Sequence, residues 1–461
     1  MNYDILTATD DPRPVHFVGI AGAGMRALAE LFAKRGIKVT GCDNNPGVAA
    51  SDLEHLGVPV FTGHDPAHVA DARAVVFTSA MPRDNAELVA AQASGVAVVR
   101  RAEALGAAVS GGKVIGVAGT HGKTTTTVMT TEALRGAGVE VTGVAGGRVE
   151  RWGGNLSFGS ENIFVVEADE YDRSFLALRP AIAVVTNVEA DHLDIYRDLE
   201  DIRGAFASYI SGARVIVLCA DDVGANTLPV PNSAEVIRYG ITSPDARLVA
   251  GDVTPAGRGV SFTVRYDGDP LGDFRLGVPG LHNVRNALAA IASGIALGVA
   301  VPKLAAGLES FGGVERRFQH IGDARGVTII DDYAHHPTEI AATLDAARAA
   351  YPGRRLVAAF QPHLYTRTRD FATDFGRMLA GADVVLLTDL YPAREKPIEG
   401  VSSALVRDAV LASGGVVAWQ GRRDDLATAL VERVQDGDVV ITIGAGDITK
   451  TAGELRDLLA E

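Results

Sequence analysis

The sequence predicts an α/β protein of three domains, built mostly on parallel sheets. Strand-like runs rich in Val and Ile alternate with amphipathic helical segments along most of the chain. Glycine-rich turns follow two of these runs, near residues 19 and 119. The chain has 461 residues, 47% of them hydrophobic, which is enough for about three packed domains.

Composition narrows the class of function. The formal net charge is -14, which argues against sequence-independent binding of nucleic acid. The cysteines, Cys42 and Cys219, lack the spacing of a metal site, so we expect a cytoplasmic protein without structural zinc. The N-terminus is acidic and polar, so no signal peptide is expected. No apolar run approaches the ~20 residues of a membrane span, so membrane insertion is not expected.

A glycine turn near the N-terminus follows the first strand-like run, residues 15–20. The turn contains Gly19, Gly22 and Gly24, and a second strand-like run ends at Asp43. This is the dinucleotide-binding fingerprint, in which the turn receives a diphosphate and the final carboxylate binds a ribose. The fingerprint alone also fits a nicotinamide-dependent dehydrogenase.

The rest of this first domain, expected to span residues 1–108, continues the alternation. Further strand-like runs occupy residues 74–79 and 97–100. Such alternation predicts a parallel sheet with helices on both faces. Gly111 and Gly112 then mark a linker.

A second glycine turn, GTHGKT at residues 119–124, is the most informative feature. It follows the strand-like run 113–118 and precedes a helical run. Backbone N–H groups and a helix start bind phosphate in such a turn, and Lys123 neutralises the charge. The strict phosphate-loop pattern is not met, because Val117 stands where the first glycine belongs. An ordinary strand-to-helix turn is the alternative, but it leaves the threonines at 125–127 without a role.

The two turns together predict an enzyme that combines a nucleotide-carried substrate with nucleoside triphosphate chemistry. A nicotinamide-dependent dehydrogenase is one alternative, but it would leave the second turn without a function. A nucleotide-switch binding protein is the other alternative. The central domain, expected over residues 109–319, continues with strands near residues 162–169, 181–192 and 214–222. Over residues 247–278 the pattern changes to short strands with turn residues, which predicts a small antiparallel sheet.

Carboxylates at strand ends beside a phosphate turn usually serve a metal ion. Glu167 ends one strand, and His192 lies just after the next. Magnesium prefers oxygen ligands, so the alternative for His192 is a histidine that only forms hydrogen bonds. The alternative for Glu167 is a surface charge without a metal. Further acidic candidates, ranked lower as solvated or outer groups, are Asp169, Glu170, Asp191 and Asp194.

Two polar pairs flank the end of the central domain. Asn283 and Asn286 begin an alanine-rich helical run. An asparagine amide can pair with a purine edge, although Asn is also a good helix cap, and we expect nucleotide contact for Asn286. Arg316 and Arg317 precede the third domain and could reach a phosphate when domains close; a solvated pair is the alternative.

The third domain, expected over residues 320–461, repeats the alternation of strands and helices. Polar residues gather at the ends of two of its strands, where parallel sheets place binding groups. Arginine in such a place suits a carboxylate ligand. The first cluster comprises Asp331, Asp332, Tyr333, His335 and His336, and the second comprises His363, Arg367 and Arg369.

Several motifs in register resemble the Mur ligase family. They are GTHGKTTT, EADEYDRSFL, NVEADHLD, HNVRNALAA, ERRFQ, DDYAHHPTEI and FQPHLYTRT. The resemblance extends from Gly19 to beyond Gly446. It implies a Rossmann-like N-terminal domain that binds a UDP-linked substrate, a central P-loop-type ATPase domain, and a Rossmann-like C-terminal domain that binds the amino acid.

The resemblance also implies an activity: ATP-dependent ligation of L-alanine to the carboxylate of UDP-N-acetylmuramate in peptidoglycan precursor synthesis. In this family the carboxylate attacks the γ-phosphate, and the amine then attacks the acyl phosphate. The implied cofactors are ATP and two Mg²⁺ ions, and the implied partners are these small molecules, with the chain a monomer or weak homodimer. The family also contains a sibling activity, which attaches a murein tripeptide to the same UDP-sugar.

The resemblance assigns roles to positions. The implied catalytic residues are Lys123, Glu167, His192, His335 and Arg367, and the implied metal ligands are Thr124, Glu167 and His192. The implied ATP site comprises Gly119, Thr120, His121, Gly122, Lys123, Thr124, Thr125, Asn286 on adenine, Arg317 on the phosphates and Asp332 on the ribose. The implied UDP-substrate site comprises Gly19, Ala21, Gly22, Ala23, Gly24, Asp43, His64, Ser79 and Asn155. The implied amino-acid site comprises His335, His363 and Arg367.

Some positions depart from the family pattern. Leu364 stands where many relatives have arginine. The motif EADEYD differs from the commoner EADESD and is similar to the tripeptide-adding sibling, whereas FQPH and DRSFL favour the alanine-adding member. Other relatives use a carbamylated lysine, but no lysine occurs between Lys123 and Lys303.

Overall fold

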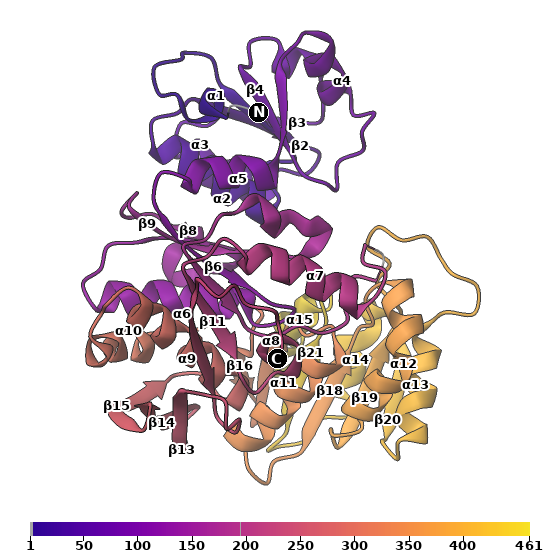
Figure 1. Ribbon diagram of the computed structural model, residues 1–461. Helices are drawn as coiled ribbons and strands as arrows, with labels where there is room; N and C mark the ends of the chain where they lie inside the picture. The colour runs from indigo at the N-terminus through magenta and orange to yellow at the C-terminus, as the bar shows by residue number, and fades with distance from the viewer. Residues whose placement is uncertain (1–2, 194) are drawn as a thin grey trace. The chain divides into compact units, whose positions relative to one another are not determined.

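The computed structural model describes residues 3–193 and 195–461 and confirms the predicted α/β class (Figure 1). Within these residues the strands form sheets of five, ten and six strands. The chain divides into two compact units: residues 1–251, 263–274 and 285–311 form one, and residues 252–262, 275–284 and 312–461 form the other. The candidate Asp194 lies outside the described residues.

The N-terminal sheet is parallel, as predicted, with the strand order β3-β2-β1-β4-β5. Its central strand β1 is fully buried, and Val15 pairs with both Val39 and Ala74. Strand β3 was not predicted, because it is short and largely exposed. The strands are β1 (Val15–Val18), β2 (Val39–Asp43), β3 (Val60–Thr62), β4 (Ala74–Phe77) and β5 (Ala97–Arg100).

Helices bury both faces of this sheet. Phe17 and Val76 pack into a core that includes residues of α2, whereas Val75 packs with Leu88 of α4 on the opposite face. Successive strand residues point to opposite faces, so both sides of β4 are covered. The helices are α1 (Asp4–Thr7), α2 (Ala23–Lys34), α3 (Gly47–Glu54), η1 (Pro66–Val69), α4 (Ala86–Ala93) and α5 (Arg101–Val109).

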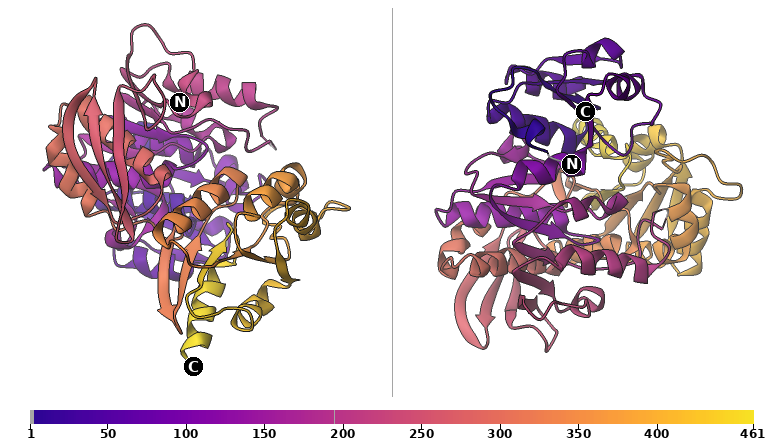
Figure 2. Two further views of the ribbon diagram at one scale, coloured as in Figure 1. Left: turned by 90° about the horizontal axis from the view of Figure 1, so that it is seen from below. Right: turned by 45° about the horizontal axis from the view of Figure 1, so that its top comes forward.

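The central sheet is mixed, with the order β15-β14-β13-β12-β11-β10-β6-β9-β7-β8. The strands from β12 to β9 pair in parallel. Strands β13, β14 and β15 lie at one edge of this sheet (Figure 2). Connections of two residues join them, which is typical of antiparallel hairpins, and this is the predicted antiparallel part. The strands are β6 (Lys113–Ala118), β7 (Thr142–Val149), β8 (Gly154–Ser157), β9 (Ile163–Glu167), β10 (Ile182–Val185), β11 (Val215–Cys219), β12 (Glu235–Gly240), β13 (Leu248–Ala256), β14 (Gly259–Tyr266) and β15 (Asp269–Leu276).

Helix α6, which follows the phosphate turn, buries a run of threonine side chains together with the apolar side chains of Val128, Met129, Ala133 and Leu134. The hydroxyls of Thr130 and Thr131 donate to the carbonyl oxygens of Thr126 and Thr127, one turn earlier. Buried hydroxyls in a helix can be satisfied in this way. The helices of this part are α6 (Lys123–Gly136), η2 (Glu150–Trp152), η3 (Tyr171–Ala177), α7 (Leu199–Ile210), α8 (Val223–Asn226), α9 (Leu281–Ala296), η4 (Val301–Leu304) and α10 (Ala305–Glu309).

The C-terminal sheet has the order β16-β17-β21-β18-β19-β20 and is parallel except for β16. Along β18, Ala358 and Phe360 pack into one core and Val357 and Ala359 into another, so helices cover both faces. The strands are β16 (Gln319–Ala324), β17 (Val327–Asp332), β18 (Leu356–Phe360), β19 (Val384–Thr388), β20 (Val417–Gly421) and β21 (Val439–Ile443). The helices are α11 (Pro337–Ala350), α12 (Tyr365–Leu379), α13 (Ser403–Ala412), η5 (Arg423–Asp425), α14 (Leu426–Val431) and α15 (Thr449–Ala460).

In the described part of the chain, no helix combines the length and the apolar character needed to cross a membrane.

Candidate active site

The predicted phosphate turn connects the end of β6 to the start of α6, as the sequence indicated. Gly119 and Gly122 have φ angles of 145° and 80°, which L-residues rarely adopt. A Cβ atom on Gly119 would lie 1.9 Å from Thr186 Oγ1, and one on Gly122 would lie 2.7 Å from Asn286 Oδ1. Both glycines are therefore required by the backbone and by their neighbours.

The segment after β10 holds the turn in place. Asn187 Oδ1 accepts the backbone N–H of His121 at 2.7 Å, and Thr186 Oγ1 donates to the His121 carbonyl at 2.6 Å. The N–H of Glu189 donates to Thr120 Oγ1 at 2.9 Å. These contacts fix the turn before any ligand arrives, which reduces the ordering cost of binding. Thr186 and Asn187 were not predicted as site residues, because their role depends on how a neighbouring strand is placed.

Lys123 points back over the turn. Its Nζ donates to the carbonyl oxygens of Gly119 at 2.7 Å and Thr120 at 3.1 Å. It also donates to both carboxylate oxygens of Glu170, at 2.9 and 2.7 Å. Glu170 is buried, so Lys123 is already neutralised by an internal carboxylate. Glu170 was predicted to be a solvated or outer group, and the structure places it beside the lysine.

Lys123 and Glu170 each stabilise the charged form of the other. Burial acts to lower the pKa of Lys123, but the nearby carboxylates, chiefly Glu170, outweigh it and raise that pKa. Burial acts to raise the pKa of Glu170, but the positive charges of Lys123 and His192 lower it. Both groups are therefore ionised at neutral pH.

Replacing Glu170 with glutamine is expected to destabilise the ligand-free protein, because Lys123 would keep a buried charge without its counter-ion. Loss of one partner of a buried ion pair costs about 3 kcal/mol, so the thermal unfolding midpoint should fall. ATP should restore part of the loss, since its phosphates can replace the carboxylate. Glu200→Gln is the matched control, because the Glu200 side chain is 83% exposed. Equal midpoints for Glu170→Gln and Glu200→Gln would contradict the expectation.

Glu167 ends β9, as predicted, and turns toward β7. Its Oε2 accepts the N–H of Gly146 at 2.5 Å. Burial raises the pKa of Glu167, although the positive charge of Lys123 opposes the shift. Burial without a full counter-charge disfavours the charged carboxylate, so a nearby cation would stabilise it.

His192 lies in a left-handed backbone conformation, with φ of 52°. Its Nε2 lies 3.6 Å from Glu170 Oε1 and 3.8 Å from Asp191 Oδ2. Burial acts to lower the pKa of His192, but these carboxylates raise it. Non-glycine residues with positive φ cluster at functional sites, and His192 lies beside the Lys123–Glu170 pair.

Asn286 lies in the first part of α9 and reaches the same turn. Its Oδ1 accepts a hydrogen bond from Thr126 Oγ1 at 3.1 Å. Asn283, by contrast, donates through Nδ2 to the Pro279 carbonyl at 2.7 Å, as a capping residue would. The structure thus joins Asn286 to the phosphate turn.

The N-terminal glycine turn is organised by Asp43, whose Oδ2 accepts the N–H of Ala21 at 3.1 Å. The backbone N–H groups of Gly19 and Ile20 donate to the carbonyl of Cys42, at 2.8 and 3.0 Å. The predicted carboxylate therefore contacts the turn itself.

The other predicted UDP-site residues occupy separate places in the same unit. His64 lies against Glu87, with 3.0 Å between His64 Nδ1 and Glu87 Oε2. Asn155 is buried, and its Oδ1 accepts from Arg26 Nη2 at 2.8 Å. Ser79 donates to Asp172 Oδ2 at 2.6 Å.

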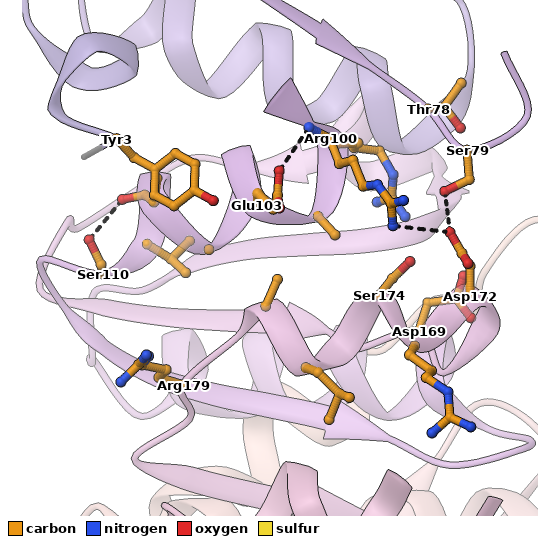
Figure 3. Close-up of a pocket in the computed structure, with 18 of the residues that line it drawn as sticks. Tyr3, Thr78, Ser79, Arg100, Glu103, Ser110, Asp169, Asp172, Ser174 and Arg179 are labelled. Atoms are coloured by element: carbon orange, nitrogen blue, oxygen red, sulfur yellow. Dashed lines mark hydrogen bonds and ion pairs between the residues drawn. The ribbon is translucent and has the colours of Figure 1, made fainter. Parts of the chain in front are cut away.

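Ser79 and Asp172 border a cavity of about 830 Å³ between the N-terminal sheet and η3 (Figure 3). Figure 3 shows Ser79, Arg100 and Asp172 converging on its wall, with 3.9 Å between Arg100 Nη1 and Asp172 Oδ2. Arg101 also lines the cavity, and its Nη1 would lie 2.9 Å from a Cβ on Gly24. Arg101, which sequence analysis did not identify, thus connects the cavity to the glycine turn.

In the other unit, Asp332 ends β17 with both carboxylate oxygens engaged. They accept the backbone N–H groups of Phe318 at 2.9 Å and Ala334 at 2.8 Å. Burial raises the pKa of Asp332 to about 6, with partial opposition from Arg317. The guanidiniums of Arg316 and Arg317 lie 4.7 and 5.1 Å from the centre of the Tyr333 ring, within cation–π distance.

The predicted amino-acid residues gather at the ends of β17 and β18 in this unit. The rings of His335 and His363 lie 6.1 Å apart. Burial lowers the pKa of His363 to about 4, and the nearby positive charges of Arg367 and Arg394 add to the shift. Arg367 is buried on α12. His363 is therefore uncharged at neutral pH, beside a cation.

Leu364, the position that departs from the family pattern, is also buried. It has φ of 68° and ψ of 137° and precedes the first residue of α12. Its side chain thus belongs to the interior.

The structure therefore groups the predicted residues into three sets. The phosphate turn, Glu167, His192 and Asn286 form the first set. The second set comprises the N-terminal turn with Asp43, and Ser79 at the cavity that Arg101 links to this turn. His64 and Asn155 lie elsewhere in the same unit. Arg317, Asp332, His335, His363 and Arg367 form the third set.

Three family models match this chain in succession. Residues 14–113 match the Mur ligase family catalytic domain, residues 117–294 match the Mur ligase middle domain, and residues 316–446 match the Mur ligase glutamate ligase domain.

Curated relatives cover nearly the whole chain. A UDP-N-acetylmuramate–L-alanine ligase of Salinibacter ruber is 42% identical over 452 residues, which is 97% of this chain and 95% of the relative. The enzyme of the same name from Cutibacterium acnes is 44% identical over 453 residues, 97% of this chain and 96% of the relative.

Solved structures agree with this likeness. A UDP-N-acetylmuramate-alanine ligase of Thermotoga maritima superposes with a TM-score of 0.82 at 28% identity, over 97% of this chain and 99% of that one. A murein peptide ligase of Psychrobacter arcticus has a TM-score of 0.70 at 26% identity, again over 97% and 99%.

Proposed function

The chain belongs to the Mur ligase family, and from its residues we propose how it ligates L-alanine to UDP-N-acetylmuramate in peptidoglycan precursor synthesis. ATP, UDP-N-acetylmuramate and L-alanine give ADP, phosphate and UDP-N-acetylmuramoyl-L-alanine. A carboxylate oxygen bonds to the γ-phosphorus as ADP leaves. The alanine nitrogen then bonds to the acyl carbon, phosphate leaves and the amine loses a proton. The observation that carries this proposal is the ordered phosphate turn with Lys123.

Lys123 is proposed to hold the β- and γ-phosphates, with backbone N–H groups of residues 119–125 around them. In the ligand-free chain its ammonium contacts Glu170. Phosphate oxygens would replace that carboxylate. Phosphoryl transfer depends mainly on positioning and charge neutralisation, and a lysine fixed over the turn supplies both.

Magnesium ions fit the donor groups of this site. Carboxylate and hydroxyl oxygens are preferred Mg²⁺ ligands, and Glu167 and Thr124 offer them, with His192 as the unusual nitrogen donor. The raised pKa of Glu167 is consistent with a carboxylate that lacks a full counter-charge. We assign Thr124 to one ion, and Glu167 and His192 to a second. Bound there, Mg²⁺ would offset the repulsion between the substrate carboxylate and the triphosphate.

The UDP-linked substrate is assigned to the N-terminal turn and the cavity next to it. Gly19–Gly24 would receive the diphosphate, with Asp43, His64, Ser79 and Asn155 as further contacts. The Arg101 guanidinium beside Gly24 adds a diphosphate ligand of the right charge and shape.

The remaining roles are also proposals. Asn286 would contact adenine, Arg317 the phosphates and Asp332 the ribose, while His335, His363 and Arg367 would bind L-alanine. We expect the enzyme to act in the cytoplasm as a monomer or weak homodimer, on these small molecules and without nucleic acid or membrane insertion.

Release of phosphate from ATP is expected to require both UDP-N-acetylmuramate and L-alanine. The acyl phosphate cannot form without the sugar carboxylate, and it turns over only when an amine accepts the acyl group. A coupled phosphate assay with each substrate omitted tests this, with product mass as the second readout. Equal phosphate release without the sugar nucleotide would contradict the mechanism. Faster turnover with a murein tripeptide than with L-alanine would favour the sibling activity.

Replacing Arg367 with lysine is expected to raise the KM for L-alanine about 10- to 100-fold and to leave the KM for ATP nearly unchanged. Lysine keeps the charge but loses the planar fork that matches a carboxylate. The loss corresponds to ~1.5–3 kcal/mol, as for a hydrogen bond to a charged group. Arg369→Lys is the matched control, since Arg369 is exposed on the same helix and pairs with Asp370. An unchanged alanine KM in Arg367→Lys would indicate a structural ion pair instead.

A further inference from the structure

Five side chains outside the ATP site converge inside the N-terminal domain. They come from β1, β2, the turn into η1, η1 itself and α4. They are His16, Cys42, His64, His68 and Glu87. No step of the ligation above uses the cluster as a whole.

The cluster has the dimensions of a metal site. Cys42 Sγ lies 2.8 Å from Glu87 Oε2, and His68 Nδ1 lies 2.7 Å from Glu87 Oε1. His16 Nε2 lies 3.6 Å from Glu87 Oε1. One ligand atom from each of these four residues lies within 4.8 Å of all the others. In a tetrahedral zinc site with bonds of ~2.0–2.3 Å, neighbouring ligand atoms lie ~3.3–3.7 Å apart, so a small outward movement makes room for an ion.

The surroundings of His16 provide a second, independent indication of a metal site. Its side chain is fully buried, and its Nε2 has no hydrogen-bond partner. Buried polar atoms are rarely left unpaired. The other ring nitrogen, Nδ1, lies 2.9 Å from Thr40 Oγ1. If Nδ1 donates to that hydroxyl, the lone pair of Nε2 points into the cluster, which is how outer hydrogen bonds orient metal-binding histidines.

We propose that His16, Cys42, His68 and Glu87 bind one Zn²⁺ ion, with His64 beside it. A thiolate and two imidazoles select a borderline-soft cation such as zinc over magnesium. Cys42 and Glu87 are fully buried, while the side chains of His64 and His68 are 15% and 17% exposed, which gives the ion a way in. Binding displaces the thiol proton of Cys42 to solvent. Four protein ligands leave no open position, so the site is structural.

Hydrogen bonding alone is the competing explanation. Burial acts to raise the pKa of Glu87, but hydrogen bonds from the surrounding histidines and Cys42 lower it to about 2. Glu87 would then be a buried anion that orders its neighbours. That account explains the contacts of Cys42, His64 and His68, but His16 Nε2 lies 3.6 Å from Glu87 Oε1, beyond hydrogen-bond distance.

A bound ion would brace the N-terminal glycine turn. The Cys42 carbonyl accepts the N–H groups of Gly19 and Ile20, so an ion that fixes Cys42 also fixes the strand end that holds the turn. This consequence rests on the proposed substrate site, whereas metal binding itself does not.

The test uses Co²⁺ and Zn²⁺ on the full-length protein stripped with a chelator, without substrates. We expect one Co²⁺ per chain with a thiolate-to-cobalt charge-transfer band, tetrahedral visible bands, and displacement of Co²⁺ by Zn²⁺. Cys42→Ser should abolish the thiolate band, and His68→Gln should weaken Zn²⁺ binding at least about 100-fold. Cys219→Ser and His55→Gln, which change the other buried cysteine and an exposed histidine of the same domain, should bind as the wild type does.

Thermal unfolding separates loss of the ion from loss of the fold. With chelator, Cys42→Ser and His68→Gln should unfold near the wild-type midpoint, and added Zn²⁺ should raise the midpoint of the wild type and of the two controls only. A wild-type cobalt complex without the thiolate band, or Zn²⁺ binding that survives Cys42→Ser unchanged, would overturn the proposal. Because these readouts need no turnover, their failure would leave the ligase assignment intact.

Discussion

Replacing Lys123 with alanine is expected to lower kcat by about 10²–10³-fold. The ammonium is the side-chain cation that the structure holds over the phosphate turn, and loss of one such electrostatic contact to a transition state costs about 10²–10³ in rate. Lys123 would also bind ATP in the ground state, so the KM for ATP should rise as well. Phosphate release at saturating substrates measures both effects.

Lys113→Ala is the matched control for this variant. Lys113 begins β6, the strand that leads into the turn, and its side chain is exposed, so wild-type rates are expected. The Lys123 variant should be checked for folding by its unfolding midpoint, because Glu170 loses its counter-ion. A folded Lys123→Ala enzyme within tenfold of the wild-type rate would remove the lysine from the phosphate site.

Replacing Glu167 or His192 with alanine is expected to lower kcat by about 10²–10³-fold, the scale of losing a preorganised charge stabiliser. Both side chains are proposed to bind the same Mg²⁺ ion. The double variant should therefore be little worse than either single variant, because residues that act as one unit are not additive. The rate of each single variant should also require a higher Mg²⁺ concentration.

A titration of activity against Mg²⁺ for the wild type, the two single variants and the double variant measures these effects. Glu200→Ala, at an exposed position, controls for loss of a carboxylate. Losses that multiply in the double variant would show that Glu167 and His192 serve separate functions. Near-wild-type rates for both single variants would remove them from the metal site.

The fold could be predicted because hydrophobic periodicity and glycine turns are local signals. Strands such as β6 and β21 are mostly apolar and buried, β6 from Val114 to Ala118 and β21 throughout, as is typical of parallel sheets. The short strand β3 has an exposed end and no such run, so the sequence did not reveal it. The antiparallel edge could be predicted because its turns contain Asp267 and Gly268, which tolerate positive φ.

The candidate site was only partly predictable, because side-chain direction depends on the backbone. Glu167, Asp169, Glu170 and Asp172 occur within one short acidic motif, and nothing in that pattern says which carboxylate reaches Lys123. The structure selects Glu170, because the chain leaves β9 and turns before η3. The histidine, cysteine and glutamate cluster of the N-terminal domain was missed for a related reason. Its members come from distant parts of the sequence, and spacing rules detect only ligands that are close in sequence.

The backbone of Leu364 limits how this position can vary. A non-glycine residue with φ of 68° and ψ of 137° stores of order 1–3 kcal/mol of strain. Glycine would relieve that strain, but it would also loosen the join between His363 and the helix that carries Arg367. An arginine side chain would have to occupy the buried space that Leu364 fills, unless the start of the helix moved. The backbone conformation and the burial of this side chain therefore limit which residues can replace Leu364, independently of any contact with a ligand.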